Sequence, residues 1–364
     1  MKKKSKIASA VVALGTIAST AGALYMYKSF FTRKHAPAAE FNAYNEFPEL
    51  QERLFAERSH EEWKLTAFDG LNLKAHYFPA NTDCHVYAII MHGYASTYCS
   101  MLPQAIHFME KGYHLLMPEQ RGHGGSEGDY FGFGFHEHYD LQAYISMVCE
   151  RDPEAQIILL GVSMGAATVM MTAGEYLPSN VKCVIAHCGY TSGWEENVHI
   201  LKKRYRLPAF PILHIGDLLM RIKHHYSYKE AAPIKYVAKA TVPMLFIHGD
   251  QDDFVPFSML QPLYEACSSP EKDFLVVVGA EHANAVLVNP ELYWQKVDSF
   301  IDQYKTVKPI FHKQKGGSHN TPRSCENPLF AIISALLIRF LPASSIHRPT
   351  DSNLTRRLFQ FLRS

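Results

Sequence analysis

The order of apolar and polar positions along the chain predicts a parallel β-sheet covered by helices. Short apolar runs with the length of buried strands occur at residues 86–91, 114–117, 157–160, 181–186, 244–247 and 274–278. Segments with apolar residues at helical spacing lie between them, at 101–111, 139–150 and 166–176. Continuous apolar strands are buried on both faces, and strands that alternate with helices pair in parallel. We therefore expect the α/β class: a mostly parallel sheet with helices on both faces.

Two segments depart from this alternation. Residues 63–68 and 71–78 alternate apolar and polar positions around Asp69-Gly70. This pattern predicts an antiparallel hairpin with a two-residue loop, leading into the sheet. Residues about 190–240 carry helical patterns of their own and are too many for one crossover between strands. An insertion here lies near the carboxyl ends of the strands, where open α/β sheets bind ligands, so we predict a small helical lid.

Both ends of the chain differ from residues 61–305, which carry the pattern described above. Residues 1–28 open with four lysines and continue as an uncharged, largely apolar stretch over 7–27. About 21 helical residues cross the ~30 Å core of a bilayer, so this segment is predicted to be a membrane anchor or a signal segment. Residues 29–60 are expected to form a polar, partly helical spacer. Residues 306–364 have little pattern and are expected to form a poorly ordered tail.

Three cellular locations stay open at this stage. The lysines before the apolar stretch favour a cytoplasmic N-terminus, a membrane anchor and an exported catalytic body. The small residues Ala21-Gly22-Ala23 also fit a cleavage site, so secretion after signal cleavage is an alternative. Seven cysteines without a C-x-x-C pair are instead typical of buried thiols in a reducing compartment. That pattern favours the cytoplasm.

Composition and missing motifs exclude several function classes. With 47% hydrophobic and 20% charged residues the chain is globular, and a net charge of +1 gives no field that would attract nucleic acid. Neither a P-loop nor a dinucleotide fingerprint occurs, so we expect no cofactor. His136-Glu137-His138-Tyr139-Asp140 matches an H-x-H-x-D metal motif. It opens a predicted helix and lacks the histidine that should follow, so we expect no metal site.

The sequence Gly161-Val162-Ser163-Met164-Gly165 is a G-x-S-x-G motif between a predicted strand and a predicted helix. In that context the motif forms a nucleophile elbow, where a strained turn lifts the serine hydroxyl out of the sheet. The N-terminus of the helix that follows stabilises a developing negative charge. The motif therefore predicts Ser163 as a catalytic nucleophile.

A serine nucleophile needs a base that takes its proton and an acid that orients the base. In folds with this elbow the acid precedes the histidine, and both follow the serine along the chain. Asp250, Asp252 and Asp253 follow the strand at 244–247, and His282 follows the strand at 274–278. Because these loops leave the carboxyl ends of their strands, they are expected to converge on the elbow, and all three aspartates are candidates.

An oxyanion hole requires two hydrogen-bond donors beside the nucleophile. The backbone N–H of Met164, directly after the nucleophile, is expected to supply one. The backbone N–H of Tyr94, in the loop after the strand at 86–91, is expected to supply the other. His92 opens this loop and is interpreted as a structural residue and not as a second base.

Over residues 60–305 the chain resembles the α/β-hydrolase superfamily, and more closely bacterial hydrolases of the serine-aminopeptidase-like or lysophospholipase-like type that carry an N-terminal hydrophobic segment. The motifs that carry this resemblance are HGYAST (92–97), PEQRGHGGSEG (118–128), GVSMG (161–165), CGYTS (188–192), YRLPAFPIL (205–213), HGDQDDFVP (248–256) and GAEHAN (279–284). The family's acid stands three residues before the Val255-Pro256 step, and the resemblance therefore selects Asp252. Three positions depart from the family pattern: Glu119, His187 and Glu281.

The resemblance implies a serine esterase, lipase or peptidase that acts on an ester, thioester or amide acyl group. Apolar lid residues favour a small-molecule or lipid-like acyl substrate. The alternative is a membrane-anchored protein that keeps the hydrolase fold, has lost activity and works by binding. Glu281 stands next to His282 and is the departure nearest to the predicted chemistry.

Overall fold

The computed structural model of the protein describes residues 20–25, 27, 28, 32 and 47–305. These residues contain a sheet of eight strands: β1 Glu61–Thr66, β2 Asn72–Phe78, β3 Val86–Met91, β4 His114–Glu119, β5 Gln156–Val162, β6 Val181–His187, β7 Met244–Gly249 and β8 Lys272–Val277. Their order across the sheet is β1-β2-β4-β3-β5-β6-β7-β8. β2 pairs antiparallel with β1 and β4, and the other pairs are parallel. The prediction of a mostly parallel α/β sheet is confirmed.

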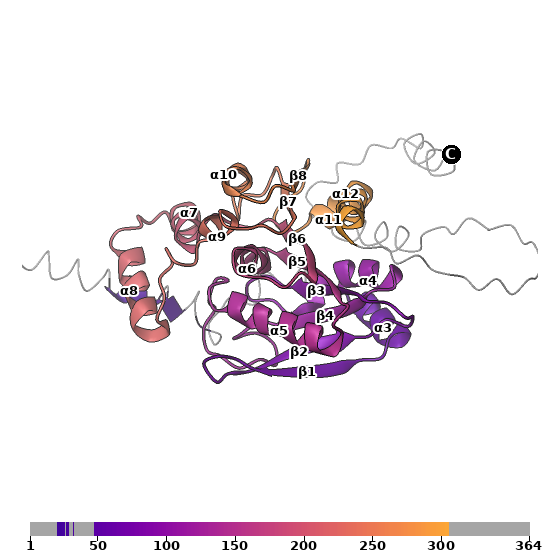
Figure 1. The fold of residues 1–364 in the computed structure, drawn as a ribbon. Helices are drawn as coiled ribbons and strands as arrows, with labels where there is room; N and C mark the ends of the chain where they lie inside the picture. Colours follow the sequence, from indigo (N-terminus) through magenta and orange to yellow (C-terminus); the bar gives the residue numbers. More distant parts are fainter. Residues whose placement is uncertain (1–19, 26, 29–31, 33–46, 306–364) are drawn as a thin grey trace, which may run out of the picture. The chain divides into compact units, whose positions relative to one another are not determined.

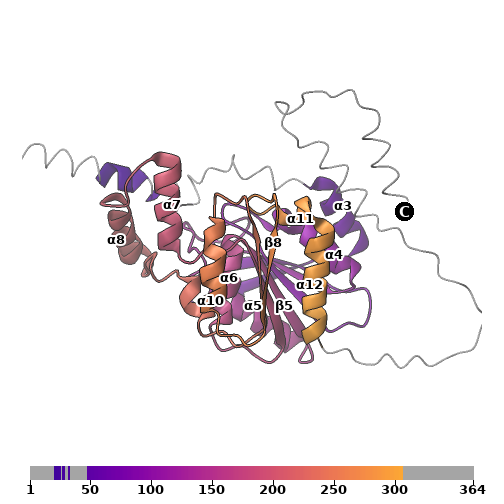
Figure 2. The same cartoon turned by 90° about the horizontal axis from the view of Figure 1, so that it is seen from above.

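Helices pack on both faces of the sheet (Figures 1 and 2). One face carries α5 Glu137–Arg151, α6 Met164–Ala173, α9 Pro233–Val237 and α10 Leu260–Ala266. The other carries α3 Pro48–Glu57, α4 Leu102–Glu110, α11 Ala285–Val288 and α12 Pro290–Tyr304. Two further helices are α7 Gly193–Tyr205 and α8 Ile212–His224, and two short 3₁₀ turns are η2 Tyr98–Met101 and η3 Phe257–Met259.

The central strand β5 is buried on both of its faces, and this is why a continuous apolar run predicted it. Ile157, Ile158, Leu159 and Leu160 are all fully buried, because β5 lies between β3 and β6 with helices on both sides. Burying one such side chain contributes about 1.5–3 kcal/mol to folding. This strand ends directly at the predicted nucleophile, so the most buried part of the fold supports the site.

The hairpin between β1 and β2 differs from its prediction, which gave a two-residue loop. The Ala67 N–H donates to the Leu71 carbonyl oxygen (2.8 Å), so Phe68, Asp69 and Gly70 form a three-residue loop. Gly70 has φ +87°, the left-handed conformation that the last position of such a loop requires. The two-residue loop is therefore wrong, although the antiparallel pairing is present.

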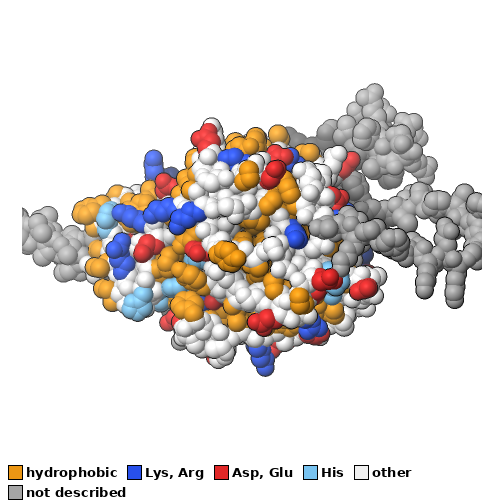
Figure 3. All heavy atoms as spheres, in the orientation of Figure 1, with side chains coloured by type: hydrophobic (Ala, Val, Ile, Leu, Met, Phe, Trp, Pro, Cys, Tyr) orange, Lys and Arg blue, Asp and Glu red, His pale blue; other side chains and the backbone are white. Residues whose placement is uncertain are grey.

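The inserted segment between β6 and β7 contains α7, α8 and α9, and we call residues 190–240 the lid. α8 buries Leu213 and Met220 in a cluster that also includes Met164, the residue after the predicted nucleophile. Its outer side leaves Leu218 and Ile222 exposed. At the lid end of the view in Figure 3, hydrophobic side chains lie beside basic ones. The lid is thus continuous with the core at the elbow, and its outer side presents apolar and basic side chains together.

Most of the predicted membrane segment at 7–27 lies outside the described residues, as do most of the spacer at 29–60 and the tail at 306–364. No helix in the described part of the chain has both the length and the apolar character needed to cross a bilayer. Membrane anchoring stays a prediction from the sequence. The described end of this segment contacts the lid, because the Tyr27 hydroxyl lies 2.7 Å from Nε2 of His224.

The segment expected to be a spacer contributes directly to the domain. Helix α3 packs on the face of the sheet that also carries α4. Its Leu50 and Leu54 side chains are buried, and so is Phe47 just before it. Residues ahead of β1, from Phe47 through α3, are therefore part of the folded domain.

Acidification is expected to lower the contribution of three buried histidines to stability between about pH 6.5 and pH 4, offset in part by the raised pKa of the buried Glu137. Burial lowers the pKa of His92 and His138 to about 4 and that of His187 to about 3. Below pH 6.5 these three imidazoles bind protons in the unfolded chain but stay neutral in the folded one. The free energy of unfolding therefore falls as pH falls. Each contributes about 1.4 kcal/mol per pH unit in that window. The thermal unfolding midpoint, measured by circular dichroism from pH 8 to pH 4, checks this.

His187 offers the matched control for this pH dependence. Within the described residues neither of its ring nitrogens has a hydrogen-bond partner. Replacing His187 by phenylalanine removes one titrating group without removing a hydrogen bond, and the fall of the unfolding midpoint with pH should become shallower. A midpoint that stays constant from pH 6.5 to pH 4 would contradict the argument.

Candidate active site

Ser163 occupies a strained turn between β5 and α6. Its backbone has φ 57° and ψ −115°, a conformation that non-glycine residues rarely adopt. The glycines on either side leave no room for a side chain. A Cβ on Gly161 would lie 2.1 Å from the Gly165 carbonyl oxygen, and one on Gly165 would lie 2.1 Å from the Met91 carbonyl oxygen. The turn is thus a nucleophile elbow that packs tightly against β3.

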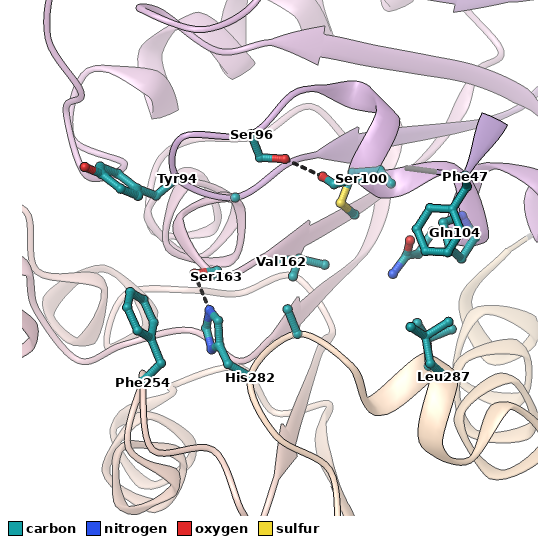
Figure 4. A pocket seen from close by; sticks show the side chains of 15 residues that line it. Phe47, Tyr94, Ser96, Ser100, Gln104, Val162, Ser163, Phe254, His282 and Leu287 are labelled. Carbon is teal, nitrogen blue, oxygen red and sulfur yellow. Dashed lines mark hydrogen bonds between the residues drawn. The ribbon is translucent and has the colours of Figure 1, made fainter. Parts of the chain in front are cut away.

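A chain of hydrogen bonds links Ser163, His282 and Asp252. The Ser163 hydroxyl donates to Nε2 of His282 (2.9 Å), and Figure 4 shows this contact. Nδ1 of His282 donates to Oδ2 of Asp252 (2.8 Å). Asp252 lies in the loop after β7 and His282 in the loop after β8, as the positions at the carboxyl ends of these strands suggested. Hydrogen bonds in this order are the ones that the predicted roles of nucleophile, base and orienting acid require.

The surroundings of Asp252 keep its carboxylate ionised. Oδ1 accepts hydrogen bonds from the backbone N–H groups of Phe254 (3.1 Å) and Val255 (2.9 Å), and Nε2 of His248 lies 3.3 Å from Oδ2. Burial alone would raise the pKa of Asp252. The hydrogen bonds from His248 and His282 outweigh burial and hold this pKa well below its usual range. His248 was not predicted as part of the site, although it opens the HGDQDDFVP motif.

The other two candidate aspartates have different partners. Oδ1 of Asp250 accepts a hydrogen bond from the Gly279 backbone N–H (2.6 Å), which ties together the loops after β7 and β8. Asp253 is exposed and forms an ion pair with Lys203 of α7. In the described residues, the aspartate that contacts His282 is Asp252.

The two residues predicted for the oxyanion hole lie on either side of Ser163. Met164 is the first residue of α6, so its backbone N–H is one of those that have no partner inside a helix. The loop after β3 runs close to the nucleophile, because a Cβ on Gly93 would lie 3.5 Å from the Cβ of Ser163. Tyr94, the next residue, lines the pockets described below. The placement of both residues fits donors to an oxyanion.

His92 is fully buried and holds two loops together. Its Nε2 accepts the Gln120 backbone N–H (3.0 Å), and its carbonyl oxygen accepts the Gln120 side-chain amide (2.5 Å). Burial lowers its pKa to about 4. These contacts are structural, as expected from the sequence.

The side chains of the H-x-H-x-D motif bond to protein partners. Arg121 donates to both carboxylate oxygens of Asp140 (2.7 and 2.8 Å), and Nδ1 of His136 lies 2.5 Å from the Tyr130 hydroxyl. Cys188, Asp252 and His282 are the only described side chains that gather as a possible metal-ligand set. Asp252 and His282 already bond each other, and burial raises the pKa of the Cys188 thiol. That set therefore fits a metal poorly.

Two pockets among the described residues meet at the nucleophile. The first extends from Ser163 to apolar side chains (Figure 4), namely Phe47, Met101, Pro103, Val286 and Leu287; its empty space, with the open solvent at its mouth, is about 670 Å³. The second extends toward the lid, and its empty space, again with open solvent, is about 510 Å³. Tyr94, Ser163 and Phe254 line both pockets. A substrate attacked at Ser163 therefore has room on two sides of the bond that breaks.

The three departures from the family pattern leave this geometry intact. Glu119 accepts a hydrogen bond from the Gly125 backbone N–H (2.5 Å) and stabilises the loop after β4. His187 is fully buried at the end of β6, and its carbonyl oxygen accepts the Ser163 backbone N–H (2.9 Å). Glu281 is exposed. None of the three interrupts the hydrogen bonds between Ser163, His282 and Asp252.

The fold, the elbow and this hydrogen-bonded set define the class of protein. The chain belongs to the α/β-hydrolase superfamily and is a hydrolase. Over residues 85–216 it matches the model of the family described as serine aminopeptidase, S33. YqkD of Bacillus subtilis, itself described as uncharacterized, is 31% identical to it over 250 residues, which are 67% of this chain and 81% of YqkD.

Two similar solved structures come from Pyrococcus species. The Pyrococcus furiosus esterase Pf2001 aligns with a TM-score of 0.56 at 22% identity, over 68% of this chain and 94% of the esterase. An acylaminoacyl peptidase of Pyrococcus horikoshii aligns with a TM-score of 0.52 at 17% identity, over 72% of this chain and 44% of the peptidase. At these identities the similarity shows the fold and leaves the substrate open.

Proposed function

We propose that the protein is a serine hydrolase that cleaves an ester, thioester or amide acyl bond through an acyl-enzyme intermediate on Ser163. The observation that carries this proposal is the continuous set of hydrogen bonds from the Ser163 hydroxyl through His282 to Asp252. A hydroxyl in this arrangement loses its proton to the imidazole as it attacks, which makes it a usable nucleophile near neutral pH.

In the first half of the proposed reaction Ser163 Oγ attacks the acyl carbon while His282 Nε2 takes the hydroxyl proton. The carbonyl oxygen becomes an oxyanion, and the backbone N–H groups of Tyr94 and Met164 stabilise it. Collapse of this intermediate breaks the bond to the leaving group, which receives the proton from His282. In the second half a water molecule gives its proton to His282 and attacks the acyl-enzyme, which releases the acid and restores the Ser163 hydroxyl.

Asp252 contributes by its charge and position. Its Oδ2 fixes Nδ1 of His282 as the donor, which leaves Nε2 free to accept the serine proton. The ionised carboxylate also stabilises the imidazolium that forms. We propose that the first pocket binds an apolar acyl chain, because aromatic and aliphatic side chains line its far end.

A fluorophosphonate probe is expected to label the folded protein once, at Ser163, because such probes react with activated serines. Mass spectrometry of the labelled peptide measures the site. Heat-denatured protein is the control and should stay unlabelled.

On p-nitrophenyl esters of increasing acyl length, kcat/KM should rise until the first pocket is full and then fall. A folded protein that neither labels nor hydrolyses any of these esters would instead support the inactive binding protein.

A further inference from the structure

The second pocket contains a buried carboxyl group whose role is not explained by the fold. Glu196 on α7 lines this pocket, which also contains Ser163, and only 2% of its surface is exposed. Within the described part of the chain neither of its carboxyl oxygens has a hydrogen-bond partner. Buried polar groups in folded proteins are nearly always hydrogen-bonded. An unpartnered carboxyl group that lines a pocket beside the nucleophile therefore indicates a ligand group that completes its hydrogen bonds.

Its neighbours on the same helix show that α7 itself does not need Glu196 for its own hydrogen bonds. The Ser192 hydroxyl caps the helix by accepting the Glu195 backbone N–H (3.1 Å), and the Glu195 carboxylate accepts from the Thr191 hydroxyl. Asn197 donates its side-chain amide to the Gly193 carbonyl oxygen (2.6 Å). Glu196 differs from these residues because its two carboxyl oxygens have no hydrogen-bond partner among the described residues.

The surroundings of Glu196 favour a neutral ligand. Burial, and after it the nearby charge of Asp252, raise the pKa of Glu196 well above its usual range, which favours the neutral carboxyl group. A neutral carboxyl group offers one O–H donor and one carbonyl acceptor, and an alcohol hydroxyl complements both. Arg204 lines the same pocket, and its positive charge disfavours a cationic ligand there.

We propose that the second pocket is a subsite for the alcohol part of an ester, in which Glu196 binds a neutral hydroxyl group. This inference rests on the proposed acyl-transfer function. The acyl chain then occupies the larger apolar pocket, and the bond between the two parts lies at Ser163, where the pockets meet. The chemical class of substrate is an ester of a diol or polyol with an apolar acid.

The test compares matched esters of one acid. Each ω-hydroxyalkyl butanoate (2-hydroxyethyl, 3-hydroxypropyl, 4-hydroxybutyl) is paired with the n-alkyl butanoate in which a methyl group replaces the hydroxyl, and the choline ester is the cationic probe. For at least one pair, kcat/KM of the wild-type enzyme should be about tenfold or more higher for the hydroxyl ester than for its alkyl partner. The alkyl ester cannot make the hydrogen bond to the buried Glu196 carboxyl group, which is then left without a partner in the complex.

Variants at Glu196 assign the preference to this side chain. Glu196→Met, which keeps the length but not the polar atoms, should bring the ratio between hydroxyl and alkyl esters to about one. Glu196→Gln, which keeps a neutral donor and acceptor, should retain most of it. Glu195→Gln on the same helix should leave the ratio unchanged. The ratio is the readout because a general loss of activity cancels from it, and fluorophosphonate labelling verifies that each variant is folded.

The outcomes separate this inference from the proposed function. Alkyl esters that are hydrolysed with no preference for a hydroxyl, or a preference that survives Glu196→Met, overturn the hydroxyl subsite and leave the serine hydrolase standing. A choline ester preferred over every neutral ester, with loss of that preference in Glu196→Met and Glu196→Gln, shows an ionised carboxylate that binds a cation and also overturns it. Absence of both hydrolysis and labelling in the wild type overturns both proposals.

Discussion

Ser163→Ala is expected to lower kcat/KM for every hydrolysed ester by about 10⁴-fold or more, because it removes the atom that attacks the acyl carbon. The loss should appear mainly in kcat, since both pockets that bind the substrate remain. The replacement removes one oxygen atom and keeps Cβ in the strained turn, so the fold should persist. Steady-state kinetics with p-nitrophenyl esters, together with the far-UV circular dichroism spectrum, measure both effects.

Ser100→Ala is the matched control, because Ser100 lines the same pocket and has no contact with His282. Its hydroxyl accepts a hydrogen bond from the Ser96 hydroxyl (2.6 Å) and donates one to the Thr97 carbonyl oxygen (3.0 Å). This variant should keep activity within about threefold of the wild type. If Ser163→Ala retained most of its activity toward all esters, the nucleophile would be a different group.

Asp252→Asn is expected to lower kcat by about 10⁴-fold through the protonation of His282. The backbone N–H groups of Phe254 and Val255 donate to Oδ1, and they would keep the asparagine oxygen at that place. The asparagine NH₂ would then face Nδ1 of His282 and donate to it. With Nδ1 as acceptor the ring proton lies on Nε2, which can no longer take the proton of Ser163. Kinetics across pH 6–10 measure the loss.

Two neighbouring aspartates provide the controls for Asp252. Asp250→Asn removes a contact to the Gly279 backbone, and Asp253→Asn removes an exposed ion pair with Lys203. Both should reduce kcat by less than about tenfold, since neither side chain contacts His282. A larger loss in one of them than in Asp252→Asn would move the orienting acid to that position.

The strands and the candidate site were accessible from the sequence because both follow from short local patterns. Strands buried on two faces are continuous apolar runs, and β3 was predicted with both of its ends. The loops that carry Asp252 and His282 directly follow such strands. The choice among Asp250, Asp252 and Asp253 needed the family resemblance, because adjacent carboxylates in one loop have the same local pattern.

The parts that the sequence did not reveal depend on contacts between distant segments. Phe47 lies in a stretch that looks like a polar spacer, yet it lines the first pocket because α3 packs beside α4. In the sequence, Glu196 cannot be told apart from the other polar residues of α7. What distinguishes it is that its carboxyl oxygens are buried with no hydrogen-bond partner among the described residues. Spacing along one helix carries no information about which strand or loop will cover it, and this is why both residues were missed.

The backbone of Ser163 also affects how this protein responds to random substitution. A serine at φ 57° is strained by about 1–3 kcal/mol, and every folded molecule contains that strain whether or not a substrate is bound. Glycine adopts this conformation with little cost, so a glycine at position 163 would relax the turn and abolish the nucleophile together. Selection for heat resistance and selection for turnover therefore favour opposite changes at this one residue. Thermostable variants chosen without an activity assay will include inactive ones at the elbow.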